Sequence, residues 1–242
     1  MSLQFKAQTH TGNKRQSNED RYFVREQADG SLLMAVADGV GGMPGGEKAA
    51  ELAMEAIAAA GLEERLSPER LYQLATSAHD SIVRYAAAHP RLEGMGTTLT
   101  AAVVRENAVF WVHVGDSRLY IQHSATLRQL TTDHRFLSSM IEDGDITAEE
   151  ALNHPLRNML DQCLGCPSIE PEQGNVVLEP GDRLLLCTDG LYGEVPHERV
   201  KNILLADMTA KQKATQLLEA SLNAGGKDNI TLVVVDSPAH NP

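Results

Sequence analysis

Strand-like and helix-like patterns of apolar positions alternate in the first hundred residues of the chain. We expect three strands followed by two helices, at residues 3–10, 21–25, 32–37, 47–60 and 68–88. The start of the second helix is marked by Ser67 as N-cap and by Pro68 at the first helical position. A group of strands therefore comes first and a helix pair second.

The rest of the chain repeats this order, with one interruption. Strands are expected at residues 98–104, 108–114, 119–123, 127–130, 175–178, 183–187 and 230–235, and helices at 197–205 and 209–222. Short turns separate the first four of these strands, which predicts an antiparallel meander. Residues 133–165 have no steady period apart from a capping box at Thr147 and Glu150, so we expect a flap that interrupts the sheet.

Strands in both halves, each group followed by a helix pair, predict an α+β fold. We expect a sandwich of two antiparallel β-sheets that helix pairs flank on both outer faces, with the flap as an insertion. No linker-like segment divides the chain. We therefore predict one catalytic domain over residues 1–242, with the flap at about 133–165.

Charge and composition narrow the function classes. With 42% hydrophobic residues the chain can bury a substantial core, and its formal net charge of −12 opposes binding to nucleic acid or anionic membranes. The start of the sequence lacks an apolar core of signal-peptide length, and no apolar stretch is long enough to span a bilayer. We expect a monomeric cytoplasmic protein without a nucleic-acid or membrane partner.

The three cysteines are too few for a disulfide scaffold. Cys187 lies in an apolar run, where a buried reduced thiol is expected. Cys163 and Cys166 form a C-x-x-C pair, but no second pair and no strand-to-helix junction accompanies them. A redox or zinc role for this pair is therefore the less favoured interpretation.

Aspartates recur where apolar strands end or begin. The runs LLMAVADGVGG and LLLCTDGLYG both end a strand in Asp-Gly, at Asp38 and Asp189. Asp116 follows the strand FWVHVG, Asp20 opens a strand, and Asp228 directly precedes the strand ITLVVV. Asp-Gly is also a common turn dipeptide, and for any single aspartate a turn is the better interpretation. Five such positions together favour convergence in one cleft.

Several ionised carboxylates in one cleft repel one another unless cations neutralise them. Carboxylate oxygens, a glycine carbonyl and water suit Mg²⁺ or Mn²⁺, whereas the histidine and thiolate ligands of structural zinc are not gathered here. Two such ions can share a water, lower its pKa and direct the hydroxide at phosphorus. Arg15, five residues before Asp20, is the best-placed guanidinium to hold phosphate oxygens, although alone it would be interpreted as a solvated loop residue.

The glycine-rich loop that begins at Gly39 does not match a nucleotide-binding P-loop. Gly46 is followed by Glu47 instead of lysine and a hydroxyl residue, and a carboxylate there would repel polyphosphate. Close backbone packing around a metal-binding carbonyl, followed by a helix start, explains the glycines better.

Six short motifs in this order resemble the type 2C (PPM) metal-dependent serine/threonine phosphatases, in their bacterial single-domain form. The motifs are Arg15-x-x-Asn18-Glu19-Asp20, Asp38-Gly39-x-Gly41-Gly42, Gly94-x-Gly96-Thr97-Thr98, Gly115-Asp116-Ser117-Arg118, Asp189-Gly190 and Gly226-x-Asp228-Asn229. Each motif alone is weak, but six in order across nearly the whole chain are specific.

The resemblance implies a hydrolase that removes phosphate from phosphoserine and phosphothreonine by direct attack of a hydroxide that bridges two metals, without a covalent intermediate. It implies that Asp38 bridges two Mn²⁺ or Mg²⁺ ions. The Gly39 carbonyl and Asp20 would serve one ion, and Asp189 with Asp228 would hold the other.

Further roles follow from the same resemblance. Asp116 would belong to a third, weaker metal site, and Glu19 and Asn229 would orient ligands and waters. Arg15 and Asp38 would be the catalytic residues. Val40 stands where animal members have a histidine proposed as general acid, so the sequence does not identify the group that protonates the leaving alcohol.

The resemblance also implies the partners of the protein and two alternative functions. We expect phosphorylated proteins as substrates, together with a cognate Ser/Thr kinase that the enzyme opposes. A phosphatase of partner-switching regulators shares the fold but often lacks the first-motif arginine, which is present here as Arg15. A catalytically silent pseudophosphatase that binds a partner is disfavoured because all five candidate carboxylates are present.

Overall fold

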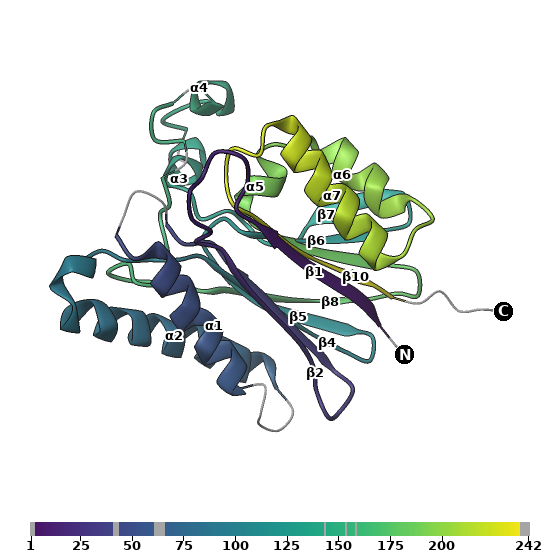
Figure 1. Ribbon diagram of the computed structural model, residues 1–242, viewed down its shortest axis with the longest axis horizontal. Coiled ribbons are helices and arrows are strands. Elements are labelled where there is room, and N and C mark those ends of the chain that lie inside the picture. The colour runs from purple at the N-terminus through teal and green to yellow at the C-terminus, as the bar shows by residue number, and fades with distance from the viewer. Residues whose placement is uncertain are drawn as a thin grey trace.

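Two stacked β-sheets with helices on both outer faces make up the protein (Figure 1). The computed structural model describes residues 3–40, 44–60, 66–142, 144–152, 154–157 and 159–237. This architecture confirms the predicted α+β sandwich. Gly41 and Gly42 of the second motif lie outside the described residues.

Each sheet has five strands, and all neighbouring strands pair antiparallel. One sheet has the order β1 (Gln4–His10), β10 (Ile230–Asp236), β9 (Arg183–Cys187), β6 (Arg118–His123) and β7 (Thr126–Gln129). The other has the order β2 (Arg21–Glu26), β3 (Leu32–Ala37), β4 (Leu99–Arg105), β5 (Ala108–Val114) and β8 (Glu172–Val177). The first and last strands of the chain are therefore neighbours in one sheet.

The helices lie in pairs on the two sheets. They are α1 (Gly46–Ala60) and α2 (Pro68–Ala88) on one side, and α6 (His197–Leu205) and α7 (Ala210–Ala224) on the other, with the short α5 (Asp189–Tyr192) after β9. The Ser67 hydroxyl accepts a hydrogen bond from the Arg70 amide, so this predicted N-cap is confirmed. None of the helices in the described part of the chain has the length and apolar composition that crossing a bilayer requires.

Strand β3 shows why the apolar run before Asp38 is continuous. All six of its residues are buried, because one face packs on the helices and the other on the opposite sheet. Leu33 and Ala35 belong to the core under α1 and α2, whereas Met34 and Val36 belong to the core between the sheets. A strand buried on both faces needs apolar side chains at every position.

The predicted meander of four strands is wrong in one respect. β4 pairs with β5 and β6 with β7, but the two pairs belong to different sheets. The chain crosses between the sheets at Gly115, whose φ is +106° and where a Cβ would lie 2.6 Å from the Thr98 side chain. Short turns predict hairpins but do not show that a turn changes sheet. The helix α5 and the 3₁₀ helix Pro90–Leu92 were also not expected.

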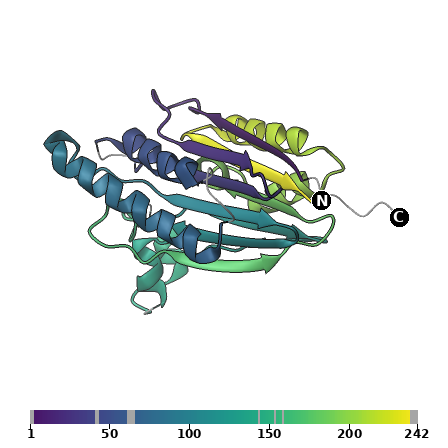
Figure 2. The same ribbon diagram turned by 90° about the horizontal axis from the view of Figure 1, so that it is seen from below.

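The flap lies between β7 and β8 and contains α3 (Phe136–Glu142) and α4 (Ala148–Leu152). Figures 1 and 2 show it projecting from the body of the protein, away from the two termini. Isolated bridges join Arg135 to Leu160 and Thr97 to Leu164. The second bridge attaches the end of the flap to the segment beside Asp38.

Candidate metal centre

A cleft of about 590 Å³ is lined by all the predicted site residues except Asp20. The candidate groups that line it are Arg15, Glu19, Asp38, Gly39, Asp116, Asp189, Asp228 and Asn229. They come from segments that directly follow β3, β5 and β9, directly precede β10, or lie in the loop between β1 and β2. Asp20 does not line the cleft and is only 1% exposed.

The backbone around Asp38 is held by two threonines. The Thr97 hydroxyl donates to the Asp38 carbonyl at 2.8 Å, and the Asp38 amide donates to the Thr98 hydroxyl at 2.9 Å. Gly39 follows in a space that admits no side chain, because a Cβ there would lie 2.5 Å from the Gly46 backbone at the start of α1. This close approach shows that Gly39 and Gly46 are needed for packing at the start of α1.

Asp20 leaves a buried oxygen without a partner. Its Oδ2 accepts a hydrogen bond from the Thr188 hydroxyl at 2.8 Å, but Oδ1 has none. A buried polar atom left unpaired costs about 1–3 kcal/mol, and more when it is charged. A cation bound at Asp20 would remove this cost.

The carboxylates also raise one another's pKa values. Burial, followed by repulsion from Asp20 and Asp189, raises the pKa of Asp38 well above its usual value. Burial, together with repulsion from nearby aspartates, raises the pKa of Asp20 and of Asp189 to about 7. Divalent cations would reverse these shifts, since they favour the ionised form.

The donor set therefore fits hard divalent cations. Carboxylates and the Gly39 carbonyl are oxygen ligands of the kind that Mn²⁺ and Mg²⁺ prefer. Among the described residues, no three of these aspartates bring their oxygens within 4.8 Å of one another. The acids are spread along the cleft, which suits more than one ion better than a single central one.

Stability of the metal-free protein is expected to fall as pH rises. Asp20 and Asp189 bind protons more tightly when folded, with pKa values of about 7, than the roughly 3.9 of an unfolded aspartate. The free energy of unfolding contributed by these groups is therefore highest below pH 4 and decreases toward pH 7. We expect the unfolding temperature without metal to drop by several degrees between pH 5 and pH 7.5.

Calorimetry with and without Mn²⁺ measures this effect. Saturating Mn²⁺ should raise the unfolding temperature more at pH 7.5 than at pH 5, and Asp20→Asn should flatten the pH dependence of the metal-free protein. A metal-free protein that is more stable at pH 7.5 than at pH 5 would contradict the assignment.

Arg15 is paired with Asp228 at the edge of the cleft. The distance from its Nη2 to Asp228 Oδ2 is 2.8 Å, and the Arg15 side chain is 45% exposed. Asn229 holds the loop that carries Arg15, because its Nδ2 donates to the Thr11 and Ser17 carbonyls, both at 2.8 Å. Its Oδ1 accepts from the Glu19 amide at 2.8 Å. Asn229 thus positions the first motif, a role that its place beside Asp228 did not indicate.

Asp116 has protein partners that the sequence interpretation missed. Its Oδ2 accepts from Arg135 Nη2 at 2.9 Å, and its carbonyl accepts from the Tyr192 hydroxyl at 2.8 Å. Arg135 also donates to the Tyr192 hydroxyl at 2.9 Å. Tyr192 belongs to α5, three residues after Asp189. It lies close to the Asp189-Gly190 motif in sequence, but nothing in the sequence marked it as a site residue.

The C-x-x-C pair is a disulfide in the structure. Cys163 and Cys166 are joined, both line the cleft, and Cys187 is a buried free thiol as expected. Leu164, between them, exchanges backbone hydrogen bonds with Thr97. The disulfide therefore closes the turn that lies against the segment holding Asp38.

Comparisons with known proteins give a family match over most of the chain. The sequence model of the family described as Protein phosphatase 2C matches residues 7–229. The serine/threonine phosphatase stp of Listeria monocytogenes serovar 1/2a is 37% identical over 235 residues, which cover 94% of this chain and 93% of that protein. The serine/threonine protein phosphatase PstP of Mycobacterium tuberculosis is 36% identical, and the match covers 97% of this chain but 45% of that longer protein.

Solved structures extend the likeness to three dimensions. The crystal structure of the Mycobacterium tuberculosis serine/threonine phosphatase PstP/Ppp matches with a TM-score of 0.89 at 35% identity, covering 99% of this chain and 100% of that one. The catalytic domain of PstP in complex with two manganese ions matches with a TM-score of 0.85 at 34% identity, covering 97% of both chains.

Proposed function

The chain belongs to the protein phosphatase 2C family, and from this premise we propose that it is a metal-dependent protein serine/threonine phosphatase. It removes phosphate from phosphoserine and phosphothreonine, as its relatives' names state for them. Two divalent cations, Mn²⁺ or Mg²⁺, are its cofactors, with Asp116 beside a third and weaker position.

The partly and fully buried carboxylates in and beside the cleft are the observation that carries this proposal. Asp20 has an unpartnered buried oxygen, and the pKa values of Asp38 and Asp189 are raised by burial and by neighbouring acids. A cleft built in this way is unfavourable until cations occupy it. The solved relative with two manganese ions supports the number of ions.

We assign the roles of the site residues as follows. Asp38 would serve both cations, Asp20 and the Gly39 carbonyl would serve one of them, and Asp189 and Asp228 would hold the other. The bound cations supply an activated water for hydrolysis and neutralise charge on the phosphate. The aspartates hold the cations in place. Asn229, together with Glu19, fixes the loop between the first two strands.

Phosphate release from a phosphothreonine peptide tests the proposal. The metal-free protein should be inactive, Mn²⁺ or Mg²⁺ should start turnover, and EDTA should stop it. Turnover of the same rate in EDTA would contradict a metal-dependent hydrolase. Stoichiometric binding of a phosphopeptide by the folded, Mn²⁺-loaded protein without turnover would instead support a pseudophosphatase.

Substituting Arg15 is expected to weaken substrate binding. Its exposed guanidinium faces the cleft and can bind phosphate oxygens, and a hydrogen bond to a charged group contributes about 1.5–3 kcal/mol. Arg15→Ala should therefore raise KM for a phosphopeptide by about tenfold or more. Lys14→Ala is the matched control, since it removes the neighbouring exposed cation. An unchanged KM in Arg15→Ala would remove Arg15 from the phosphate site.

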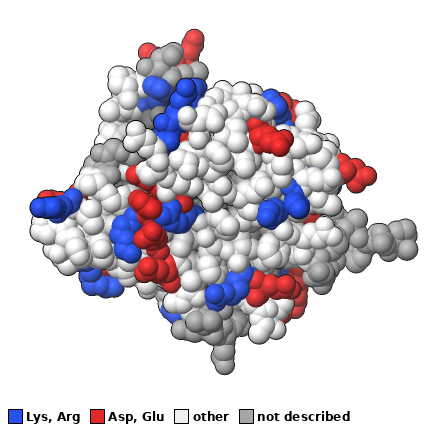
Figure 3. Space-filling model, in the orientation of Figure 1, with Lys and Arg blue, Asp and Glu red and all other residues white. Residues whose placement is uncertain are grey.

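The cellular role follows from the same proposal. Phosphorylated proteins are the substrates, and we propose that a cognate Ser/Thr kinase and its targets are among them, in the cytoplasm and with a monomeric enzyme. On the face shown in Figure 3, basic side chains are interleaved with acidic ones. This distribution, with the net charge of −12, gives no support for a nucleic-acid substrate.

A further inference from the structure

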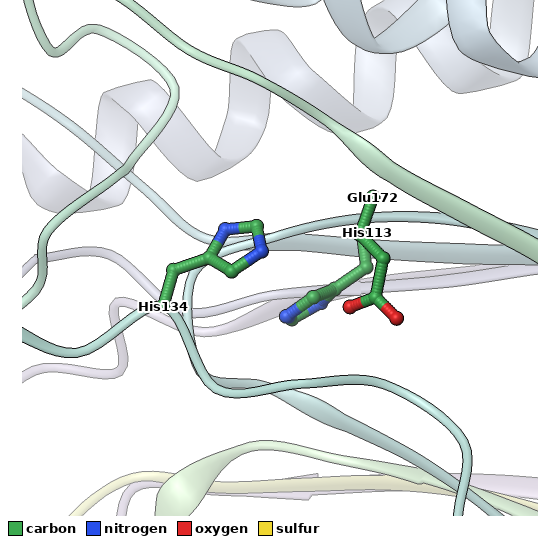
Figure 4. A group of neighbouring side chains, drawn as sticks. All are labelled: His113, His134 and Glu172. Atoms are coloured by element: carbon green, nitrogen blue, oxygen red, sulfur yellow. The ribbon is translucent and has the colours of Figure 1, made fainter. Parts of the chain in front are cut away.

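A second cluster of ligand-type side chains lies outside the aspartate cleft. His113 of β5, Glu172 at the start of β8 and His134 of the loop after β7 each offer one ligand atom, and these atoms all lie within 4.8 Å of one another (Figure 4). His113 and Glu172 are direct neighbours across the paired strands. The sequence separates the three residues widely, so only the fold brings them together.

The hydrogen bonds around His113 fix which ring nitrogen carries a proton. The Thr100 hydroxyl has one proton to donate. Its oxygen lies 2.8 Å from the Ser117 carbonyl oxygen, which can only accept a hydrogen bond. The same hydroxyl lies 2.8 Å from His113 Nδ1. The assignment that satisfies the Ser117 carbonyl gives it the hydroxyl proton, and the His113 Nδ1–H then donates to Thr100. A neutral ring then has a bare lone pair on Nε2.

This bare nitrogen faces other electron pairs. His113 Nε2 lies 3.1 Å from the Thr132 carbonyl oxygen, and the Glu172 carboxylate is beside it. His113 is 0% exposed, and burial, followed by repulsion from His134, lowers its pKa to about 3, so the ring is neutral at pH 7. Burial also lowers the pKa of His134. Lone pairs from a ring, a carbonyl and a carboxylate thus meet where a cation would satisfy them all.

The remaining contacts leave ligand atoms available. Glu172 Oε2 accepts a hydrogen bond from the Thr132 amide at 2.7 Å, which leaves Oε1 as a possible metal ligand. The Gly115 amide lies 3.3 Å from His134 Nδ1, a long hydrogen bond that a metal bond can replace. Thr132 is exposed and Glu172 and His134 are partly exposed, so an ion can enter from solvent.

We propose that His113, His134 and Glu172 form a binding site for a zinc-class divalent cation, with the Thr132 carbonyl as an additional ligand. Two imidazoles and a glutamate are a ligand set that zinc uses in proteins. Tetrahedral bonds of about 2.0–2.1 Å place neighbouring ligand atoms about 3.3 Å apart, close to the observed 3.1 Å between His113 Nε2 and the Thr132 oxygen. The Nδ1–H bond to Thr100 orients the ring, as metal-bound histidines require.

This site has a direct connection to the aspartate cleft. His134 precedes Arg135, whose Nη2 donates to Asp116 at 2.9 Å, and the His134 amide donates to the Gly115 carbonyl at 2.8 Å. A cation bound by His134 would therefore hold the segment that carries Arg135. The site differs from the cleft in its chemistry, because its nitrogen ligands favour zinc over Mg²⁺.

Zinc counting in the presence of excess Mg²⁺ tests the proposal. Mg²⁺ occupies the oxygen ligands of the cleft, and the full chain is then equilibrated with Zn²⁺ buffers and assayed for bound zinc. We expect one zinc per chain in the wild type and in Asp38→Asn. Glu172→Gln, which keeps an acceptor for the Thr132 amide, should bind this zinc at least about tenfold more weakly.

Two further variants make the result decisive. Glu170→Gln removes an exposed carboxylate two residues away and should bind zinc like the wild type, whereas His134→Gln should lose affinity like Glu172→Gln. In the cobalt-substituted protein, the visible absorption typical of nitrogen-bound four-coordinate Co²⁺ should follow the same order. The proposal is overturned if zinc uptake is equal in all variants, if Asp38→Asn alone loses it, or if the wild type binds none.

Discussion

Asp38→Asn is expected to lower kcat for phosphopeptide hydrolysis by roughly a thousandfold, equivalent to about 4 kcal/mol of transition-state stabilisation. Burial and then repulsion from four neighbouring aspartates, Asp20, Asp189, Asp116 and Asp228, raise the pKa of Asp38. Asparagine has nearly the same shape but only one oxygen, and no charge, with which to bridge two cations. The change would therefore remove the proposed shared ligand and leave the packing in place.

Asp29→Asn is the matched control for this variant. Asp29 also precedes a glycine, but it lies in the turn before β3, at the opposite end of the strand that leads to Asp38. It should keep the activity of the wild type. Steady-state kinetics at saturating Mn²⁺ measures both variants. An Asp38→Asn protein with more than a tenth of the normal kcat would contradict the bridging role.

Asp189→Asn is expected to weaken Mn²⁺ binding by about a hundredfold or more, since even outer-shell partners of a metal site contribute 10- to 100-fold to affinity. Asp189 lines the cleft, and its pKa of about 7 shows that its charge is unfavourable there without a cation. Hydrolysis should fall strongly at low Mn²⁺ and recover in part at high Mn²⁺, because one ion loses a ligand but not its whole site.

Isothermal titration of the metal-free proteins with Mn²⁺ measures this loss directly. The wild type should bind two ions tightly, and Asp189→Asn should bind one of them much more weakly. Asp20→Asn should affect the ion on the other side of Asp38. Equal Mn²⁺ affinity in Asp189→Asn and the wild type would remove Asp189 from the ligand set.

Most of the fold could be predicted from local patterns. The bounds predicted for β3, α2, β5, β9 and α6 agree with the structure. These elements have strong signals: β3 is buried on both faces, and α2 begins with Ser67 and Pro68. The sequence did not predict which strands share a sheet. The chain crosses between the sheets at Gly115, where the backbone packs closely against Thr98, and no local sequence pattern indicates this packing.

The candidate site residues could be proposed from the sequence because aspartates recur at strand ends. Asp38 and Asp189 each stand in an Asp-Gly pair after an apolar strand, and both line one cleft. Long-range partners left no such signal. The hydrogen bonds of Asn229 to Thr11 and Ser17 join opposite ends of the chain. They arise from the pairing of β1 with β10, which only the assembled sheet brings about.

The histidine and glutamate cluster shows the same limit. His113 belongs to an apolar strand, where a histidine would be interpreted as a core residue, and Glu172 follows the flap. Their contact depends on the pairing of β5 with β8, and the flap between these strands has no steady hydrophobic period from which that pairing could be predicted. A spacing rule along the chain could not have identified it.

Electron paramagnetic resonance of the Mn²⁺-loaded protein tests the two-metal site most directly. Two Mn²⁺ ions that share Asp38 should give an exchange-coupled signal when two equivalents are bound. The Asp38→Asn protein should give the six-line spectrum of isolated Mn²⁺, with little phosphopeptide hydrolysis. A six-line spectrum in a fully active wild type carrying one equivalent of Mn²⁺ would contradict the two-metal site.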